Sequence, residues 1–400
     1  MVDVRVLSLK SVKHIRDEIS RIGVDNGCLN SLSMKGKFVV LKISHLDPAS
    51  CNIIKQTALS VGTDAAVHRD VITGKEKDSN LLLFGTFKEI ERIAERLKGQ
   101  PFELNTISQK LLSYVNGKKE NRCLKLATRE LELGKKTLIM GILNVTPDSF
   151  SDGGRFLEKE KAVKRALEMI EEGADIIDIG GESSRPGSNP ISEDEELKRV
   201  LPVLVEVKGK IDVPISIDTY KSVVAEEALE RGAEIVNDIS GLRFDERMVD
   251  ILQERKAGVV IMHMLGSPRD MQDHPYYNDV IQEIYDFLRE RTDFAIRGGV
   301  DEGRIIVDPG IGFGKRHEDN LAILDMFQEF KSLGFPLLLS ASRKSFIGQT
   351  LNEPVEERLE GSLASCGIAL EEGVDIIRVH DVSATRKFID MFESIRGRKE

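Results

Sequence analysis

The sequence predicts a (β/α)8 barrel, the TIM-barrel architecture, preceded by a small α+β domain. From residue 137 onward, eight short apolar runs alternate with charged, amphipathic stretches. Eight strand-helix units of similar size, in about 260 residues, are the signature of such a barrel. Nearly every apolar run also ends in a polar or ionisable residue, as expected for strands that lead to the mouth of a barrel.

The N-terminal part lacks this rhythm and predicts a separate domain, 1–125, ahead of a barrel at 126–400. Its short apolar runs alternate with helical patterns, which is typical of a small α+β domain. The runs lie at 4–9, 38–43 and 81–84, and the helical patterns lie near 48–61, 86–98 and 105–115. The polar segment NGKKENR, at 116–122, suits a linker. No motif assigns this domain a role, so covering the barrel mouth, recognising a bulky substrate and mediating assembly all stay open.

The eight predicted strands are continuous apolar runs, as expected for parallel strands that are buried on both faces. They lie at 137–144, 175–180, 214–218, 234–240, 259–264, 304–310, 336–342 and 375–381. Helical stretches such as EKEKAVKRALEMIEEG end at a glycine that suits a helix C-terminus. An open doubly wound sheet is the alternative. It would place a GxGxxG turn after the first strand, where this chain has LNVTPDSFSDGG, so the barrel is favoured.

Composition excludes several classes of partner. The net charge of -10 and the pI of about 5.5 give no basic field for nucleic acid. The four cysteines are far apart and form no CxxC pair, which argues against a disulfide framework and indicates a reducing cytoplasm. No signal-peptide core and no apolar run of the ~18 residues that cross a bilayer are present, so we expect no membrane association.

Polar side chains at the predicted strand ends should meet at one mouth, because the active site of a barrel lies at the C-terminal ends of its strands. These candidates are Asn144, Asp178, Asp218, Asn237, Asp238, His263, Asp308, Ser342, Arg343, Lys344, Arg378 and His380. Helix capping explains any single Asp or Asn equally well, and His263 also fits a hydrogen-bonded core histidine. Capping does not explain the cationic residues after the last two strands, so the set as a whole predicts a site.

The charges at these strand ends indicate the kind of ligand. Basic residues follow strands seven and eight, the sector where barrel enzymes commonly hold phosphate, so we expect an anionic, phosphorylated ligand. Asp218, Asn237 and Asp308 follow strands three, four and six and offer hydrogen-bonding groups to a flat heterocycle. Buried carboxylates need hydrogen-bond donors, so a guanidine-like edge of the ring is a natural partner.

Two long segments carry a resemblance to a known family. GILNVTPDSFSDGG, followed by GADIIDIGGESSRPGS, closely resembles the two signature segments of dihydropteroate synthases. The shorter segments ISIDTYK, IVNDISG, VDPGIGFGK, SRKSFIG and RVHDV are similar to the remaining blocks of that family, in the same order. The resemblance covers 137–400. One departure is Ser184, which stands where the family usually has threonine and keeps the hydroxyl group.

The resemblance implies condensation of 6-hydroxymethyl-dihydropterin diphosphate with p-aminobenzoate, with departure of diphosphate before the amine attacks. It implies Mg²⁺ at Asn144, and a catalytic set of Asp152, Lys344, Arg378 and His380, in which Arg378 and His380 bind the diphosphate. The implied pterin pocket is Asp218, Asn237, Asp308 and Lys344 with Met262 and Phe313 as apolar walls. The implied p-aminobenzoate residues are Ser184, Arg185, Pro186 and Ser345. The stretch from Thr146 to Gly154, with its glycine pair, suits a loop that closes over the second substrate.

The sequence leaves other functions open. A pterin-binding methyltransferase shares the barrel and the pterin pocket, but the SSRPG and RVHD segments favour the synthase. A barrel that binds pterin without catalysis is opposed by the full set of charged strand ends. The acceptor is open, because some relatives of the family use a larger arylamine in methanopterin synthesis. The resemblance also implies a homodimer, which no sequence feature here tests.

Overall fold

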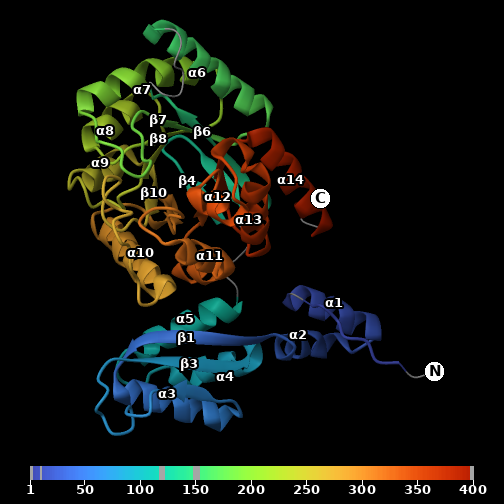
Figure 1. Ribbon diagram of the computed structural model, residues 1–400. Helices are drawn as coiled ribbons and strands as arrows, with labels where there is room; N and C mark the ends of the chain where they lie inside the picture. Colours follow the sequence, from blue (N-terminus) through green and yellow to red (C-terminus); the bar gives the residue numbers. More distant parts are fainter. Residues whose placement is uncertain (1–2, 10, 117–121, 147–153, 397–400) are drawn as a thin grey trace. The chain divides into compact units, whose positions relative to one another are not determined.

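The structure of the chain is a computed structural model that describes residues 3–9, 11–116, 122–146 and 154–396. It divides into two compact units, Met1–Glu120 and Asn121–Glu400, and each is described by itself (Figure 1). The expected p-aminobenzoate loop and strand ends belong to the second unit. Most of the segment predicted as a linker, and most of the predicted closing loop, lie outside the described residues.

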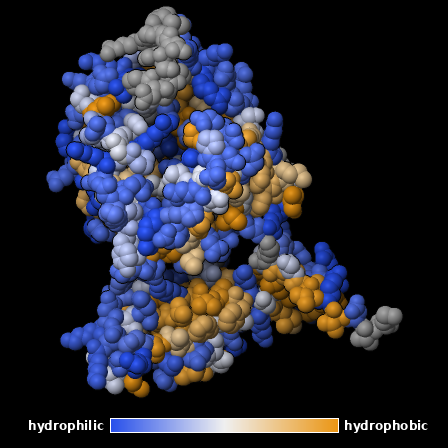
Figure 2. Space-filling view, in the orientation of Figure 1, coloured by the Kyte–Doolittle hydropathy of each residue, from blue (hydrophilic) through white to orange (hydrophobic). Residues whose placement is uncertain are grey.

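The first unit is the small α+β domain that the sequence predicts. An antiparallel sheet has the strand order β1-β3-β2. The strands are β1 (Phe38–Leu46), β2 (Ala65–Val67) and β3 (Ser79–Thr86), and the helices are α1 (Val12–Ile22), α2 (Asn26–Lys35), α3 (Pro48–Val61), α4 (Phe87–Leu97) and α5 (Leu104–Asn116). The side chain of Asp47 accepts hydrogen bonds at the start of α3, and a capping box at Thr86 starts α4. The outer face of the sheet keeps Phe38, Val40 and Leu82 exposed, and Figure 2 shows hydrophobic surface on this unit.

Two features of the first unit differ from the sequence analysis. The apolar run at 4–9 forms no strand, and its Val4 and Val6 are almost fully exposed. The helices α1 and α2 were not anticipated, although Ser11 caps α1 through its side chain. Alternating apolar residues predict a strand only where a neighbouring strand is available to complete its hydrogen bonds, and residues 4–9 have no such neighbour among the described residues.

The second unit is the predicted barrel. Its parallel sheet runs in the order β11-β10-β9-β8-β7-β6-β13-β12, and a bridge from Val307 to Leu337 joins the two ends. The strands are β6 (Leu138–Asn144), β7 (Ile176–Gly180), β8 (Ile215–Asp218), β9 (Ile235–Asp238), β10 (Gly258–Met262), β11 (Ile305–Asp308), β12 (Leu338–Leu339) and β13 (Ile376–Val379). Seven of the eight lie inside the predicted runs, and β10 begins at Gly258, one residue before its predicted run. The strand β12 is much shorter than its predicted run, which begins with Pro336, a residue without an N–H group.

Helices surround the barrel on its outside (Figure 1). They are α6 (Gly154–Glu171), α7 (Glu193–Lys208), α8 (Ser222–Glu230), α9 (Met248–Arg255), α10 (Val280–Arg297), α11 (His317–Asp325), α12 (Ser345–Leu351), α13 (Leu359–Glu371) and α14 (Val382–Ile395). Gly173 after α6 and Gly232 after α8 have φ angles of 101° and 102°, as the predicted helix ends require. No helix in the described part of the chain is long and apolar enough to cross a membrane.

A short hairpin closes the N-terminal end of the barrel. The strands β4 (Arg122–Lys125) and β5 (Glu130–Leu133) pair in antiparallel fashion. Leu124, Leu126 and Leu133 pack with the apolar side chains at the start of the barrel strands, including Met140 and Ile376. Because this end of the barrel is filled with leucine and isoleucine, polar groups gather at the opposite end, where the strands finish.

Candidate active site

Arg378 lies at the centre of the polar strand ends. It comes from β13, and its guanidinium donates from Nε to Oδ2 of Asp178 and from Nη2 to Oδ2 of Asp218, both at 2.6 Å. The two aspartates belong to β7 and β8. Nη1 makes no hydrogen bond to a described residue. Paired carboxylates therefore fix the orientation of this buried cation and leave one edge for a ligand.

Asp178 is fully buried and is a site residue that the sequence analysis placed at a strand end but left out of the pterin pocket. Its Oδ2 also accepts from Nδ2 of Asn237 at 3.1 Å. Its Oδ1 has no hydrogen-bond partner among the described residues. Buried carboxylate oxygens almost always have a donor, so this oxygen is an acceptor available to a ligand. The signal in the sequence was the second aspartate of DIIDIG, which lies inside the predicted strand.

Asp308 and Lys344 are two further charged residues of the mouth. Asp308 is 2% exposed, and its Oδ1 accepts from the N–H of Gly310 at 2.7 Å. Burial raises the pKa of Asp308 to about 6, although the nearby Lys344 and other cations oppose that rise. The Nζ of Lys344 lies 3.9 Å from the centre of the Phe313 ring, and burial lowers the pKa of this lysine to about 8. A hydrogen-bond acceptor and a cation thus stand beside an aromatic wall.

Apolar side chains gather beside these polar groups. Met262, Met264, Met271, Ile239 and Phe313 form one buried cluster after β9, β10 and β11. Met262 and Phe313, the two walls implied by the resemblance, are therefore brought together. A flat ring bound at the strand ends would have this apolar cluster on one side and the carboxylates at its edge.

The remaining basic residues after β12 and β13 bring less net positive charge to the mouth than the sequence suggests, because Arg343 is paired with Asp381 and His380 is neutral. Arg343 donates from Nε and Nη2 to the two carboxylate oxygens of Asp381, at 2.9 and 2.5 Å. Nδ1 of His380 lies 3.1 Å from Oγ of Ser342. Burial, together with Arg378 and Arg343, lowers the pKa of His380 to about 3, so its imidazole is neutral. His380 can donate one N–H to an anion but brings no charge.

Two further residues from the strand-end set are structural. Asp238 accepts from the N–H and the hydroxyl of Ser240, both at 2.7 Å, and so caps the loop after β9. His263 is 5% exposed and lies against Lys315, as expected for a hydrogen-bonded core histidine. Helix or loop capping, the alternative weighed for every acidic strand end, is thus the finding for Asp238.

Glu182 connects the two ends of the loop that holds Ser184, Arg185 and Pro186. One oxygen of this carboxylate accepts from Ile191 N at 3.0 Å and from Nζ of Lys221 at 2.5 Å, and the other accepts from the Tyr220 hydroxyl at 2.5 Å. Since Glu182 and Ile191 flank the loop, a single side chain holds both ends together. Gly187 also donates to the carbonyl of Pro268 at 2.9 Å. Glu182 is a residue that the sequence analysis missed, although it stands inside GGESSRPG.

Lys221 connects this loop to the interior. It donates to Glu196 on α7 at 2.5 Å as well as to Glu182. Glu196 is 1% exposed, its Oε1 has no partner among the described residues, and burial raises its pKa. The pair of carboxylates therefore shares one lysine, and the base of the loop is held by buried charge.

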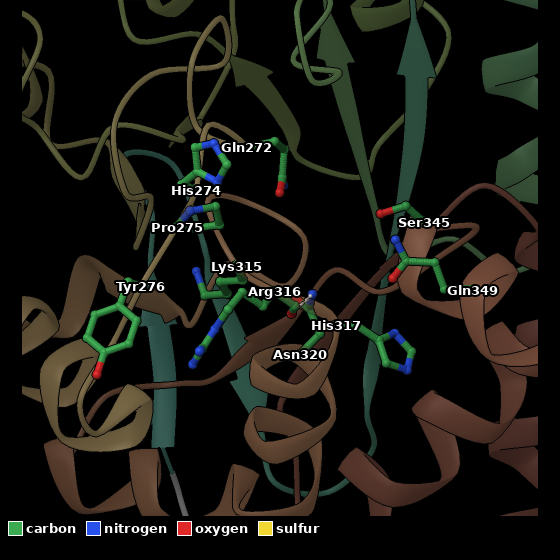
Figure 3. A pocket seen from close by; sticks show the side chains of 10 residues that line it. All are labelled: Gln272, His274, Pro275, Tyr276, Lys315, Arg316, His317, Asn320, Ser345 and Gln349. Atoms are coloured by element: carbon green, nitrogen blue, oxygen red, sulfur yellow. Dashed lines mark hydrogen bonds between the residues drawn. The ribbon is translucent and has the colours of Figure 1, made fainter.

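Ser345 lies at the edge of a cavity of about 550 Å³ beside the strand ends. The cavity is lined by the loop after β10, including Gln272 and Tyr276, and by Lys315, His317 and Gln349. Figure 3 shows Gln272 and Ser345 on opposite sides of it. The lining is polar and basic, with one tyrosine, and this suits an anionic or amide-bearing group more than an apolar one.

Asn144 is the candidate metal ligand. A Cβ placed on Gly180 would lie 3.8 Å from Oδ1 of Asn144 and 3.4 Å from Cβ of Asp218, so these two side chains flank one small space. No group of three His, Cys, Asp or Glu in the described ranges could hold a metal ion. The oxygens that face this space are the amide oxygen of Asn144 and Oδ2 of Asp218, and the latter accepts from Arg378. Asp152, which the resemblance places in the catalytic set, lies outside the described residues.

Comparisons with known proteins agree on one family. Residues 140–380 match the family model described as pterin binding enzyme. The dihydropteroate synthase of Bacillus subtilis is 47% identical over 265 residues, which cover 66% of this chain and 90% of that protein. A solved structure of the Xanthomonas albilineans dihydropteroate synthase with 4-aminobenzoic acid has 40% identity and a TM-score of 0.65, and covers 69% of this chain and 98% of that one.

Some relatives extend over both units, among them one from Helicobacter pylori. The bifunctional dihydropteroate synthase/dihydropteroate reductase of Helicobacter pylori is 33% identical over 384 residues. The match covers 95% of this chain and 96% of that protein. The likeness therefore includes the N-terminal unit, which lies outside the residues that match the family model.

Proposed function

This chain belongs to the dihydropteroate synthase family of pterin-binding enzymes, and from that membership we propose that its barrel makes 7,8-dihydropteroate. The substrates are 6-hydroxymethyl-7,8-dihydropterin diphosphate and p-aminobenzoate, and diphosphate is released. The reaction transfers a pterin-methyl group to an amine and serves folate biosynthesis. The relatives compared above are named as synthases, which favours this reaction over a pterin-dependent methyl transfer.

The observation that carries the proposal is the buried Oδ1 of Asp178, which has no donor among the described residues. A ligand with an N–H group in this position would recover the free energy that an unpaired buried oxygen costs. The pterin ring has such donors at its ring N–H and its 2-amino group. Asn237 and Asp308 follow neighbouring parts of the same mouth and extend the polar edge, while Met262 and Phe313 face the ring.

The chemistry demands charge stabilisation more than a base. The C–O bond between the pterin methylene and diphosphate breaks, and the lone pair of the arylamine nitrogen forms the new C–N bond. The proton of the amine passes to solvent or to the departing diphosphate. Nη1 of Arg378 and the ammonium of Lys344 stabilise the negative charge that gathers on the leaving group. The neutral His380 donates a hydrogen bond to the same anion.

We propose that Mg²⁺ accompanies the diphosphate, with Asn144 as its protein ligand. Mg²⁺ keeps several waters and takes few protein ligands in phosphate sites, so one amide oxygen fits this ion. When bound, it would neutralise part of the diphosphate charge. Asp218 flanks the same small space as Asn144 and keeps Arg378 in place beside it.

The proposed acceptor site lies between α12 and the loop that holds Ser184, Arg185 and Pro186. Arg185 and Pro186 pack against the arylamine ring, with the Ser184 hydroxyl nearby, and Ser345 meets the carboxylate. p-Aminobenzoate is the acceptor we favour, because a relative is solved with 4-aminobenzoic acid. A larger arylamine is the second candidate, and the cavity of about 550 Å³ beside Ser345 supports it.

Steady-state assays of diphosphate release and of dihydropteroate formation test the proposal. The pterin diphosphate is supplied with p-aminobenzoate or with a ribofuranosyl-aminobenzene phosphate, with Mg²⁺ or with a chelator. We expect product with p-aminobenzoate, and loss of most activity on chelation. Faster turnover of the ribosylated amine would assign the larger acceptor. Absence of diphosphate release with either amine would reject synthase activity.

A second candidate function rests on the Helicobacter pylori relative, whose match spans 95% of this chain. We propose that this chain also reduces dihydropteroate. A reduced nicotinamide or flavin would pass a hydride to the carbon of the pterin C=N bond, and a proton would add to the nitrogen. The test is formation of tetrahydropteroate from dihydropteroate with NADPH, with and without added flavin. If no such reductant supports it in a sample that has synthase activity, the reductase proposal fails.

We also propose a cytoplasmic location and a homodimer. The four cysteines are free, in agreement with a reducing compartment. The dimer rests on the family alone, and sedimentation of the purified chain measures it.

A further inference from the structure

Lys315 is a buried lysine that the proposed mechanism does not use. It is the last residue of VDPGIGFGK and is 3% exposed. Its Nζ lies 3.0 Å from the carbonyl of Phe313, 3.3 Å from the carbonyl of His263 and 2.9 Å from Nδ1 of His263. Three acceptors match the three N–H bonds of an ammonium group, so this side chain is fully satisfied where it lies.

The partners of Lys315 belong to two different loops. His263 directly follows β10, and Phe313 lies in the loop after β11. The two loops are closely packed, because a Cβ on Gly310 would clash with the carbonyl of His263. Gln272 adds a second link from the β10 loop, through a hydrogen bond of 3.0 Å to the carbonyl of Gly312. Lys315 is therefore the charged member of a set of links between these loops.

Both loops carry walls of the proposed pterin pocket. Met262 immediately precedes His263, and the Phe313 ring is the surface on which Lys344 rests. Figure 3 shows Lys315 on the side of the cavity where Pro275 lies, across from Ser345. Lys315 is not among the groups proposed to bind the pterin or p-aminobenzoate, although it lines the cavity beside Ser345. A change at Lys315 would thus act on the pterin pocket through Met262 and Phe313.

Charge gives Lys315 a second influence on the pocket. The positive groups that face Asp308 are Lys344, Lys315 and Arg378, and each lowers the pKa of that carboxyl. Burial, with a contribution from Lys344, lowers the pKa of Lys315 to about 7, although Asp308 and Asp319 oppose that fall. Lys315 is therefore charged at the pH near 6 where Asp308 ionises. Loss of this cation would leave Asp308 harder to ionise.

We propose that Lys315 is a positioning residue for the pterin pocket, which joins the loops after β10 and β11 and thereby sets Phe313 and Asp308 for the ring. The proposal rests on the proposed function, because it assumes that these groups bind a pterin. The competing explanation is that Lys315 only stabilises the fold. That role would lower the stability and leave substrate affinities and pH profiles as they are.

Lys315→Met tests the proposal, because methionine fills similar space without N–H donors or charge. We expect the KM for the pterin diphosphate to rise at least about tenfold, with kcat and the KM for the arylamine changed by less than about threefold. The acid limb of kcat/KM for the pterin should move to higher pH, since Asp308 has lost one cation. Lys315→Arg keeps the charge and should restore the acid limb without restoring the KM.

The matched control is Lys208→Met. Lys208 is the last residue of α7, and its side chain is 31% exposed. Its Nζ lies 3.2 Å from Oε1 of Glu234, and this ion pair is away from the mouth of the barrel. Lys208→Met should lower the urea concentration at the midpoint of unfolding without altering the KM for the pterin diphosphate or the KM for the arylamine. If Lys315→Met lowers only the midpoint and leaves the pterin KM and the acid limb unchanged, the positioning role is refuted.

Calorimetry separates this test from the proposed function. Binding of 6-hydroxymethylpterin is measured to the parent chain and to Lys315→Met, independent of any turnover. Weak binding to the variant and tight binding to the parent support positioning even if no dihydropteroate forms. If Lys315→Met does not fold, the same comparison with Lys315→Arg decides, and equal affinities of that variant and the parent overturn the proposal.

Discussion

Asp178→Asn is the substitution that best isolates ligand recognition from folding. In the structure, Oδ2 of Asp178 accepts from both Arg378 and Asn237, while Oδ1 has no donor among the described residues. The carbonyl oxygen of an asparagine can take the place of Oδ2 and keep both hydrogen bonds. Its NH2 group then takes the place of Oδ1, where it would meet an N–H of the pterin with another donor.

The expected magnitude follows from what is lost. A hydrogen bond to a charged acceptor contributes about 1.5–3 kcal/mol, so the pterin affinity should fall roughly 10- to 150-fold. The cost to stability is smaller than the ~3–5 kcal/mol for removing a partner from a buried ion pair. Asp218 still pairs with Arg378 at 2.6 Å, and the asparagine still accepts. We expect a loss of about 1–3 kcal/mol in unfolding free energy.

Calorimetric titration with the pterin diphosphate measures the first quantity, and urea unfolding measures the second. The matched control is Asp375→Asn. Asp375 is 3% exposed and accepts from Leu337 N at 2.9 Å, at the start of β13 and therefore at the opposite end of the barrel. This control should lose stability and keep its pterin affinity. If the pterin affinity of Asp178→Asn stays within about threefold of the parent, the orphan oxygen is not a pterin acceptor and the reasoning fails.

Three other outcomes are expected. Arg185→Ala should leave calorimetric binding of the pterin diphosphate unchanged and reduce turnover at least about tenfold; lost pterin affinity would place Arg185 in the other pocket. Glu182→Gln should raise the KM for the arylamine about three- to tenfold, because a neutral amide holds the loop ends less firmly, and unchanged kinetics would contradict the clamp. Burial raises the pKa of Asp308 to about 6, above the value of about 3.9 in the unfolded chain. The contribution of Asp308 to stability should therefore fall as the pH rises between these two values. Pterin binding should strengthen over the same range, because the carboxylate that accepts from the ring is then ionised. Urea unfolding and calorimetry at about pH 5 and about pH 7.5 measure both trends, and pterin binding that is independent of pH would contradict this role.

The barrel could be predicted because its strands are buried on both faces. Continuous apolar runs of that kind have few alternatives, and each of the eight observed strands overlaps one predicted run, with only Gly258 of β10 lying outside. The polar residues that end them are the ones that the structure brings together, as with Asp218, Asn237 and Arg378. The distinction between ligand-binding and capping residues was beyond the sequence. Asp238 and Asp308 look alike in the chain, and each accepts from the N–H two residues further on. Only Asp238 also accepts from the Ser240 hydroxyl and from Leu242 N, which uses both of its carboxylate oxygens and identifies it as a cap.

The features that the sequence did not predict depend on contacts between distant segments. Glu182 holds both ends of a loop, and Lys315 joins two loops, but neither role has a local pattern. Arg378 was expected to meet an anion, whereas its aspartate partners lie 200 and 160 residues away along the chain. Such pairings form only when the sheet closes, so they cannot be predicted from one segment of the sequence at a time. The short hairpin β4–β5 was missed for the same reason, since its leucines pack against the starts of the barrel strands.

That hairpin also bears on how such a chain can acquire new parts. The barrel begins at β4, on the face that leucine side chains seal, and the eight loops of the reactive face all come later in the sequence. A segment added ahead of β4 is therefore joined to the catalytic unit through its inert end. Fusion at this point interrupts none of these eight loops in the sequence, so a leading segment can be gained or lost while all eight loops are inherited intact.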